Sequence, residues 1–253
     1  MPRIDSLSWR KISIAYITTH RSGSIAGSRF SRIFMPWAKV IWEILLQVIF
    51  ERGYLIPAMN NATTDYVACA AVLARSIREW HPGAKICLLT DKPMEHCDFD
   101  LVTTLPHGDQ ATQEWKLVND WQVFDATPFR ETIKLEADMF CASPIDHWWT
   151  LLQCRDVVVS RGSRDFHDRP AQSRHYRRVF DINHLPDLYN ALVYWRRSRV
   201  AQQFFHLVRD IFREWNHYRA LLKFSDDVPT TDVVYAMAAQ IMGPELVTLP
   251  PGF

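Results

Sequence analysis

The stretch ETIKLEAD, residues 131–138, decides the fold class. Its first part, Glu131–Leu135, contains β-branched side chains and predicts a buried strand that ends at Glu136-Ala137-Asp138. One residue separates the two carboxylates, so both side chains can converge where the strand ends. Mg²⁺ and Mn²⁺ prefer oxygen ligands, typically one or two carboxylates plus substrate phosphates. The stretch therefore favours a metal role for Glu136 and Asp138, with a solvated surface pair as the alternative.

Strands and helices alternate on both sides of this stretch. Short apolar runs predict further strands at Tyr54–Met59, Lys85–Leu89, Phe99–Thr103, Asp156–Ser160 and Leu188–Trp195. Helices are predicted over Asp65–Trp80 (capped by Thr63 and Thr64), Glu114–Ala126, Pro144–Leu152, Val200–Trp215 and Thr231–Met242. This alternation predicts an α/β fold with a mostly parallel sheet and helices on both faces. Ligands bind beyond the carboxyl ends of such strands, where we expect Asn60, Asn61, Asp91, Glu136, Asp138 and the segment near Asn190.

The first 52 residues differ from the rest. Thr18–Ser31 is rich in Ser, Gly and Arg and predicts a basic loop, and Pro36 fits the first turn of an amphipathic helix that ends near Glu51. We therefore expect a basic N-terminal helical arm, 1–52, and one larger domain, 53–253. The helix favours packing on its own domain or in a homodimer. A membrane-surface helix is the alternative, but it usually carries a broad Lys/Arg face, which this one lacks.

Composition excludes several classes of protein. The 253 residues are 48% hydrophobic and carry a net charge of +1, which excludes disordered and collagen-like chains and a general polyanion binder. The most apolar stretch, Val40–Phe50, is too short to cross a bilayer, and no signal peptide is recognisable. We expect a cytoplasmic protein with no integral membrane segment. The five cysteines form no CxxC pair, which favours reduced thiols in the core.

Charge is distributed unevenly along the chain. Residues 155–219 contain 13 arginines and no lysine, whereas 53–154 are mainly acidic. The contrast suggests a cleft that handles both a cation and an anion, with scattered solvated charge as the alternative. In Arg161–Arg178 the arginines alternate with His and Tyr. Guanidinium groups suit phosphate oxygens and aromatic rings suit stacking on bases, so this segment favours an anionic partner.

Four short motifs follow one another on the predicted elements: Glu114-Trp115-Lys116-Leu117 before Trp121, Glu136-Ala137-Asp138, Leu188-Tyr189-Asn190-Ala191-Leu192 and Thr230-Thr231-Asp232. In order and spacing the set resembles nucleotide-sugar glycosyltransferases of the GT-A fold. It is most similar to the retaining, glycogenin-like group, and within it to enzymes encoded by bacteriophages. The resemblance spans about Gly53–Gly243. If the chain is encoded by a phage, we expect the protein in the cytoplasm of the host cell.

The resemblance implies a metal-dependent hexosyltransferase that uses a UDP-sugar and retains the anomeric configuration. Glu136, where the family usually has Asp, and Asp138 would bind Mn²⁺ or Mg²⁺, which holds the donor diphosphate. Lys116, Asn190 and Asp232 would be catalytic, reaching the diphosphate or the donor sugar. The nucleotide-sugar would contact Ala58, Asn60, Asn61, Tyr66, Asp91, Lys116, Glu136, Ala137, Asp138 and Asn190. Two simpler roles compete: Asn60-Asn61 as a turn, and Asp232 as a helix cap.

One family motif is missing. The usual His-x-x-Gly-x-x-Lys stretch near the C-terminus has no counterpart, because no His follows His217. A truncated chain, a water ligand, or His184 or His175 would each account for the third metal ligand. The gap motivates a second hypothesis, a catalytically weak or inactive sugar-nucleotide-binding relative. A nucleotidyltransferase is disfavoured, because no Gly-rich phosphate loop follows the first strand.

The acceptor side is the least determined. The resemblance places Arg174, Arg177 and Arg178 in the part of the fold that binds the acceptor. The similarity to phage enzymes suggests phage DNA carrying hydroxylated pyrimidines, whereas composition alone supports only an anionic partner. Glycan, lipid and protein acceptors are the alternatives.

Overall fold

The computed structural model describes residues 50–111, 116–162, 178–224 and 228–249. All of them belong to one compact unit, Leu46–Phe253. The predicted N-terminal loop and most of the predicted helix lie outside the described residues. The end of the predicted helix, at residues 50 and 51, is wrong. These residues begin the first strand, in which Phe50 lies opposite Phe129 and Arg52 opposite Glu131. The predicted boundary at 52/53 therefore falls inside a strand.

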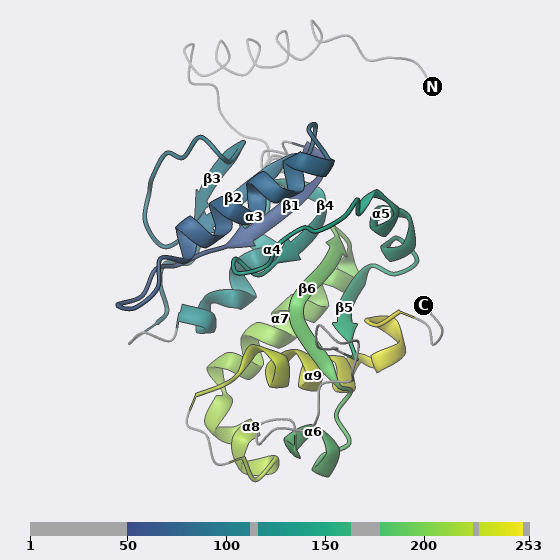
Figure 1. Cartoon of the computed structure of the whole chain (residues 1–253). Coiled ribbons are helices and arrows are strands. Elements are labelled where there is room, and N and C mark those ends of the chain that lie inside the picture. The colour runs from purple at the N-terminus through teal and green to yellow at the C-terminus, as the bar shows by residue number, and fades with distance from the viewer. Residues whose placement is uncertain (1–49, 112–115, 163–177, 225–227, 250–253) are drawn as a thin grey trace, which may run out of the picture. The chain divides into compact units, whose positions relative to one another are not determined.

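Six strands form one sheet in the described part of the chain (Figure 1). They are β1 (Phe50–Pro57), β2 (Ile86–Thr90), β3 (Leu101–Thr104), β4 (Phe129–Leu135), β5 (Val157–Arg161) and β6 (Leu188–Arg196), in the order β3-β2-β1-β4-β6-β5. The pairs from β3 to β4 are parallel, which confirms the predicted mostly parallel sheet. β6 is antiparallel to both of its neighbours, and this direction could not be predicted from an apolar run alone.

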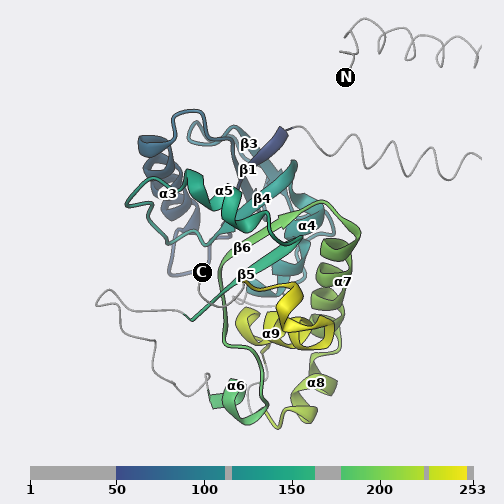
Figure 2. The same ribbon diagram turned by 90° about the vertical axis from the view of Figure 1, so that its right-hand side faces the viewer.

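Helices cover both faces of the sheet, as predicted (Figures 1 and 2). α3 (Tyr66–Trp80) and α5 (Asp146–Leu152) lie on one face, and α7 (Arg199–Arg213) and α9 (Thr231–Met242) lie on the other. Consecutive strand residues therefore enter different cores: Leu55 packs with the α7/α9 side and Ile56 with the α3/α5 side. Burial on both faces explains why the inner strands are almost continuously apolar.

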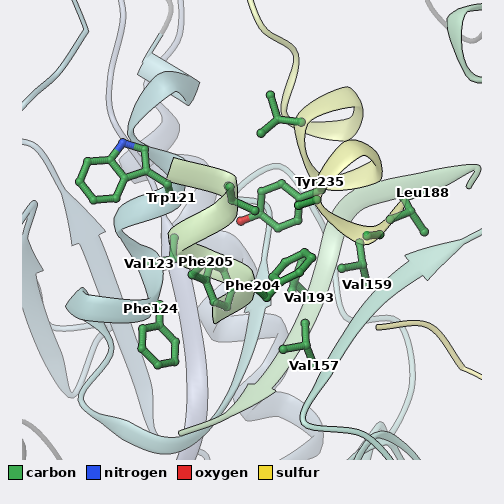
Figure 3. Packing of buried hydrophobic residues seen from close by; sticks show 14 of the residues in the cluster. Trp121, Val123, Phe124, Val157, Val159, Leu188, Val193, Phe204, Phe205 and Tyr235 are labelled. Carbon is green, nitrogen blue, oxygen red and sulfur yellow. The ribbon is translucent and has the colours of Figure 1, made fainter. Parts of the chain in front are cut away.

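The core on the α7/α9 side is rich in aromatic rings (Figure 3). Phe204 and Phe205 of α7 pack against Tyr235 of α9, with ring centroids 5.6 and 6.2 Å apart. Phe205 also meets Trp195 of β6 edge to face at 4.9 Å. These rings lie over Val157 and the neighbouring strand residues, so aromatic packing holds α7 and α9 against the sheet.

The segment before β4 differs from its predicted helix. Glu114 and Trp115 lie outside the described residues, and a 3-10 helix, η1 (Lys116–Gln122), is followed by the short α4 (Val123–Ala126). Buried polar side chains hold η1 against the loop before it. The Asn119 side chain accepts the Gln110 N–H at 2.7 Å, and Gln122 accepts the His107 N–H at 2.9 Å. These tertiary hydrogen bonds explain why the segment departs from a regular α-helix.

The remaining helix boundaries differ by smaller amounts. α3 begins at Tyr66, and its cap is Asp65, which accepts the Ala68 N–H at 3.0 Å, instead of the predicted threonines. The helix predicted over Val200–Trp215 corresponds to α7 and ends two residues earlier, at Arg213. Three short elements were not predicted: α6 (Arg178–Ile182), α8 (Trp215–Leu221) and η2 (Pro244–Leu246). None of the described helices combines the length and apolar character needed to cross a membrane.

Gly53 lies where β1 passes closest to its neighbours. A Cβ added there would lie 2.4 Å from the Phe129 ring and 2.6 Å from the Lys85 carbonyl oxygen. Gly53→Ala should therefore lower the free energy of unfolding by about 1–3 kcal/mol, because the strand has to shift. At Gly83 an added Cβ meets nothing within 4 Å, so Gly83→Ala should change it by less than about 0.5 kcal/mol. Urea unfolding measures both, and equal stabilities would contradict the packing.

Candidate functional site

A cavity of about 310 Å³ opens at the carboxyl edge of the sheet, between the ends of β1 and β4 and the helix η1. The parallel pairing of β1 with β4 brings these strand ends to one edge. The cavity is lined by Pro57, Ala58, Met59, Asn61, Tyr66, Lys116, Leu117, Asp120, Lys134, Glu136, Ala137 and Asp138. Most residues predicted for the nucleotide-sugar thus converge there. The exceptions, which do not line it, are Asn60, Asp91 and Asn190, and Asp232, which was predicted to be catalytic, does not line it either.

The turn after β1 is built by two asparagine side chains. Asn60 accepts the Val67 N–H at 2.9 Å, and Asn61 accepts the N–H groups of Thr63 and Thr64 at 2.9 and 2.8 Å. Asn60 is exposed, whereas Asn61 also lines the cavity. The two interpretations of Asn60-Asn61 are therefore compatible, since Asn61 both closes the turn and faces the site. Tyr66, at the first turn of α3, is half-buried and adds a ring to the same wall.

Glu136 and Asp138 occupy the opposite wall. Asp138 is exposed and Glu136 is half-buried, with its backbone N–H donating to the Ala191 carbonyl at 3.1 Å. Burial raises the pKa of Glu136 above its ordinary value. The ammonium of Lys134 opposes this shift, and the nearby carboxylates Asp120, Asp138 and Asp232 add to it. A cation at this wall would relieve that repulsion.

The donor chemistry of this wall fits a divalent cation. Two carboxylates share one cavity and leave the other coordination positions to phosphate oxygens and water. Within the described ranges, the one group of three candidate ligands that converge is His96, Cys97 and Asp98, none of which lines the cavity. His184 follows α6 and does not line it either, and His175 lies outside the described residues. Metal binding by Glu136 and Asp138 stays a prediction.

Lys116 lies between two carboxylates. Its ammonium is 3.3 Å from Asp91, which follows β2, and it also forms a hydrogen-bonded pair with Asp109. The hydrogen bond that Lys116 donates to Asp109 and the field of both carboxylates raise the pKa of Lys116 above its ordinary value. Asp91 does not line the cavity itself, but it contacts Lys116, which does. The arrangement holds a positive charge at the cavity wall.

A buried polar cluster extends from the cavity into the protein. It contains an ion pair between Lys134 and Asp120, which line the cavity, and this pair was not predicted from the sequence. The ammonium of Lys134 is 2.8 Å from the Asp120 carboxylate, and these side chains are only 2% and 3% exposed. Asp120 also accepts hydrogen bonds from Asn190 and from the Tyr235 hydroxyl, which points toward the helix carrying Trp121 in Figure 3. A lysine inside an apolar strand was the available signal, because a buried lysine needs a partner.

Asn190 and Asp232 belong to this cluster. The Asn190 side chain is fully buried, and its backbone N–H donates to Asp232 at 2.8 Å. Asp232 lies in the first turn of α9, whose cap residue is Thr230, so the structure does not support Asp232 as the cap. Whether either residue reaches a donor sugar stays a prediction. Their described role is to join β6 to α9 behind the cavity.

The residues predicted for the acceptor are mostly beyond the described ranges. Arg174 and Arg177 lie outside them, and Arg178 is exposed at the first position of α6. Arg178 does not line the cavity. Nothing in the described part of the chain tests their role.

The raised pKa of Glu136 has a consequence for stability. Below the ordinary value of 4.5 the carboxyl is protonated in both the folded and unfolded states, and above it folding has to oppose ionisation. Glu136→Gln should therefore be more stable than the wild type at about pH 7.5 without divalent cations, and the difference should vanish at about pH 4. Urea midpoints at both pH values measure this. Exposed Glu95→Gln is the control, and a difference that persists in acid would refute the assignment.

Comparisons with known proteins show the fold. No protein-family model and no curated protein matches the chain. The solved structure of the galactosyltransferase LgtC, in complex with donor and acceptor sugar analogues, is similar at 11% identity over 73% of this chain and 70% of that one, with a TM-score of 0.50. TarS 1–349 from S. aureus is 10% identical over 75% and 55% of the two chains, with a TM-score of 0.38. The sheet and the likeness to LgtC establish a GT-A, Rossmann-like fold.

Proposed function

We propose that this chain is a metal-dependent glycosyltransferase that transfers a sugar from a UDP-sugar to a hydroxyl acceptor. One observation carries the proposal. Three separate segments of the chain bring an aromatic ring, an amide, a lysine and two carboxylates into one cavity at the carboxyl edge of a GT-A sheet. These are largely the residues that the sequence motifs assign to the base, the diphosphate and the metal.

The nucleoside would bind at the wall formed by β1 and α3. The half-exposed Tyr66 ring offers a stacking face for a base. The Asn61 oxygen is occupied by the turn, but its amide nitrogen makes no hydrogen bond among the described residues and can donate to a uracil oxygen. The buried backbone of Ala58 adds a small, close wall.

The diphosphate would bind between Lys116 and the carboxylate wall. Mn²⁺ held by Glu136 and Asp138 would supply Lewis-acid stabilisation to the departing diphosphate. Asp91 and Asp109 hold the Lys116 ammonium at the same cavity, where it can contact a phosphate oxygen. A fixed charge of this kind helps most when charge builds on the leaving group. Retention at the anomeric carbon follows from the sequence resemblance, and the anomeric configuration of the product would test it.

A sugar-nucleotide-binding protein without efficient turnover is the second candidate. It is favoured by one observation: the described lining offers only the motif carboxylates and the paired Asp120 as acidic ligands, with no histidine. Calorimetry with UDP-sugars, together with an assay of donor hydrolysis with and without Mn²⁺, separates the candidates. Binding without hydrolysis or transfer would support the second.

Asp138 supplies the sharpest test of the metal. Asp138→Ala should weaken Mn²⁺-dependent UDP binding at least about tenfold, because a carboxylate ligand is lost. The melting temperature should hardly change, since Asp138 is exposed. Asp210→Ala removes an exposed carboxylate from α7 and should leave UDP binding unchanged. Calorimetry measures both variants, and equal affinity for UDP in wild type and Asp138→Ala would refute the metal assignment.

We also propose a nucleic-acid acceptor. The Arg-rich segment supports an anionic partner, and the sequence resemblance to phage enzymes suggests DNA with hydroxylated pyrimidines. Binding should then weaken steeply with salt, with a log–log slope of roughly −3 to −4 for about four phosphate contacts. Charge reversal at Arg174 and Arg178 should flatten that slope and leave UDP affinity unchanged. Titration of unmodified and hydroxymethylated duplexes at several salt concentrations measures this. A flat response for both duplexes would leave glycan, lipid or protein acceptors.

A further inference from the structure

Lys134 and Asp120 form a charged floor beneath the cavity. Both residues line it, although their side chains are almost fully buried. Removing two charges from water is costly, and a buried ion pair is often no more stabilising than apolar side chains of similar size. Stability alone therefore gives no strong reason for a charged pair at this position. Its place in the cavity suggests a role in binding.

The hydrogen bonds of this floor are incomplete. The Lys134 ammonium has three N–H groups, of which the Asp120 carboxylate, at 2.8 Å, and the Asn190 carbonyl, at 3.2 Å, accept two. Among the described residues nothing accepts the third. The side-chain oxygen of Asn190 is buried and has no donor there either. A buried donor and a buried acceptor thus remain unpaired in one cluster, which is costly unless a ligand or water pairs them.

Three kinds of ligand group could lie against the unpaired N–H of Lys134: a phosphate oxygen, an apolar group or a hydroxyl. A phosphate oxygen could accept from Lys134, but it would place negative charge beside Asp120 and Glu136. An apolar group would leave the ammonium N–H unpaired. A hydroxyl group can accept this N–H without adding charge. Sugars present hydroxyls with fixed positions, and a site with buried polar atoms discriminates strongly against an analogue that lacks the matching hydroxyl.

We propose that Lys134, which lines the cavity, is a specificity-determining residue that donates its remaining N–H to a hydroxyl of the donor sugar. The inference rests on the proposed function, since it assumes a UDP-sugar in this cavity. Asp120 is a positioning residue: it holds the ammonium and is itself held by Asn190 and Tyr235, at 3.1 and 2.5 Å. The choice of sugar is thereby made by the floor, separately from the binding of UDP.

Two matched variants test the inference. Lys134→Met alone would leave Asp120 as an unpaired buried charge, so both variants also carry Asp120→Asn. Lys134→Met/Asp120→Asn has no donor at the floor, whereas Lys134→Gln/Asp120→Asn has similar size and keeps an N–H donor. Lys85→Met/Asp100→Asn removes a Lys–Asp pair of similar length, 2.9 Å, away from the cavity and serves as the control. Thermal melting checks that each variant is folded.

Calorimetry with Mn²⁺ compares UDP with UDP-glucose, UDP-galactose and UDP-N-acetylglucosamine. The Met variant should bind UDP within about twofold of the wild type and lose about tenfold in discrimination among the sugars, as expected for one lost hydrogen bond in a buried site. The Gln variant should keep most of the discrimination, and the control all of it. Unchanged discrimination in the Met variant, or an equal loss in both the Met and Gln variants, would overturn the inference.

The wild-type protein gives an independent test that needs no variant. Among monodeoxy analogues of the UDP-sugar that it binds most tightly, one should bind about tenfold more weakly than the parent, because it leaves the third N–H of Lys134 unpaired. Equal binding of all analogues would overturn the inference while leaving the proposed function intact. A wild type that binds neither UDP nor any of the three UDP-sugars would instead overturn the proposed function itself.

Discussion

The ammonium group of Lys134 lies inside the protein, where a charge has to be balanced by its immediate neighbours. Asp120 provides that balance from η1, so η1 has to lie against β4. Tyr235 of α9 and Asn190 of β6 donate to the same carboxylate, which joins the helix layer and the antiparallel strand to this point. Lys116, at the cavity, begins the same 3-10 helix. One buried ion pair thus connects four elements behind the site.

The electrostatics of the cavity follow from this arrangement. Burial raises the pKa of Glu136, the carboxylates of Asp120, Asp138 and Asp232 add to this shift, and the Lys134 ammonium opposes it. A diphosphate alone would be repelled by such a wall. A divalent cation would reverse the sign of the local charge, and Lys116, held by Asp91 and Asp109, supplies positive charge on the facing side. The site is therefore suited to a cation and an anion bound together, which is the combination that the proposed sugar transfer needs.

Strong local patterns allowed much of the fold to be predicted. The helix predicted over Thr231–Met242 has the same bounds in the structure, because an apolar helical run there follows a pair of threonines. The end of β4 at Leu135 was also predicted, because charged residues follow an apolar strand. The errors lie where tertiary contacts prevail over local preference. Phe50 belongs to β1 because it pairs with β4, and η1 is not α-helical because Asn119 and Gln122 bind the preceding loop.

The sequence by itself determined the α/β class and the residues that stand at the carboxyl ends of β1 and β4, since strand periodicity and the polar residues that end a strand are local properties. It also indicated that Tyr66, Lys116, Glu136 and Asp138 act together. Only the tertiary structure decided that β6 runs antiparallel, that Lys134 and Asp120 form the floor of the cavity, and that Asn190 is buried behind it. These features depend on pairing and burial between segments far apart in the chain, and the energy of a buried charge is set by the neighbours that the complete fold brings to it.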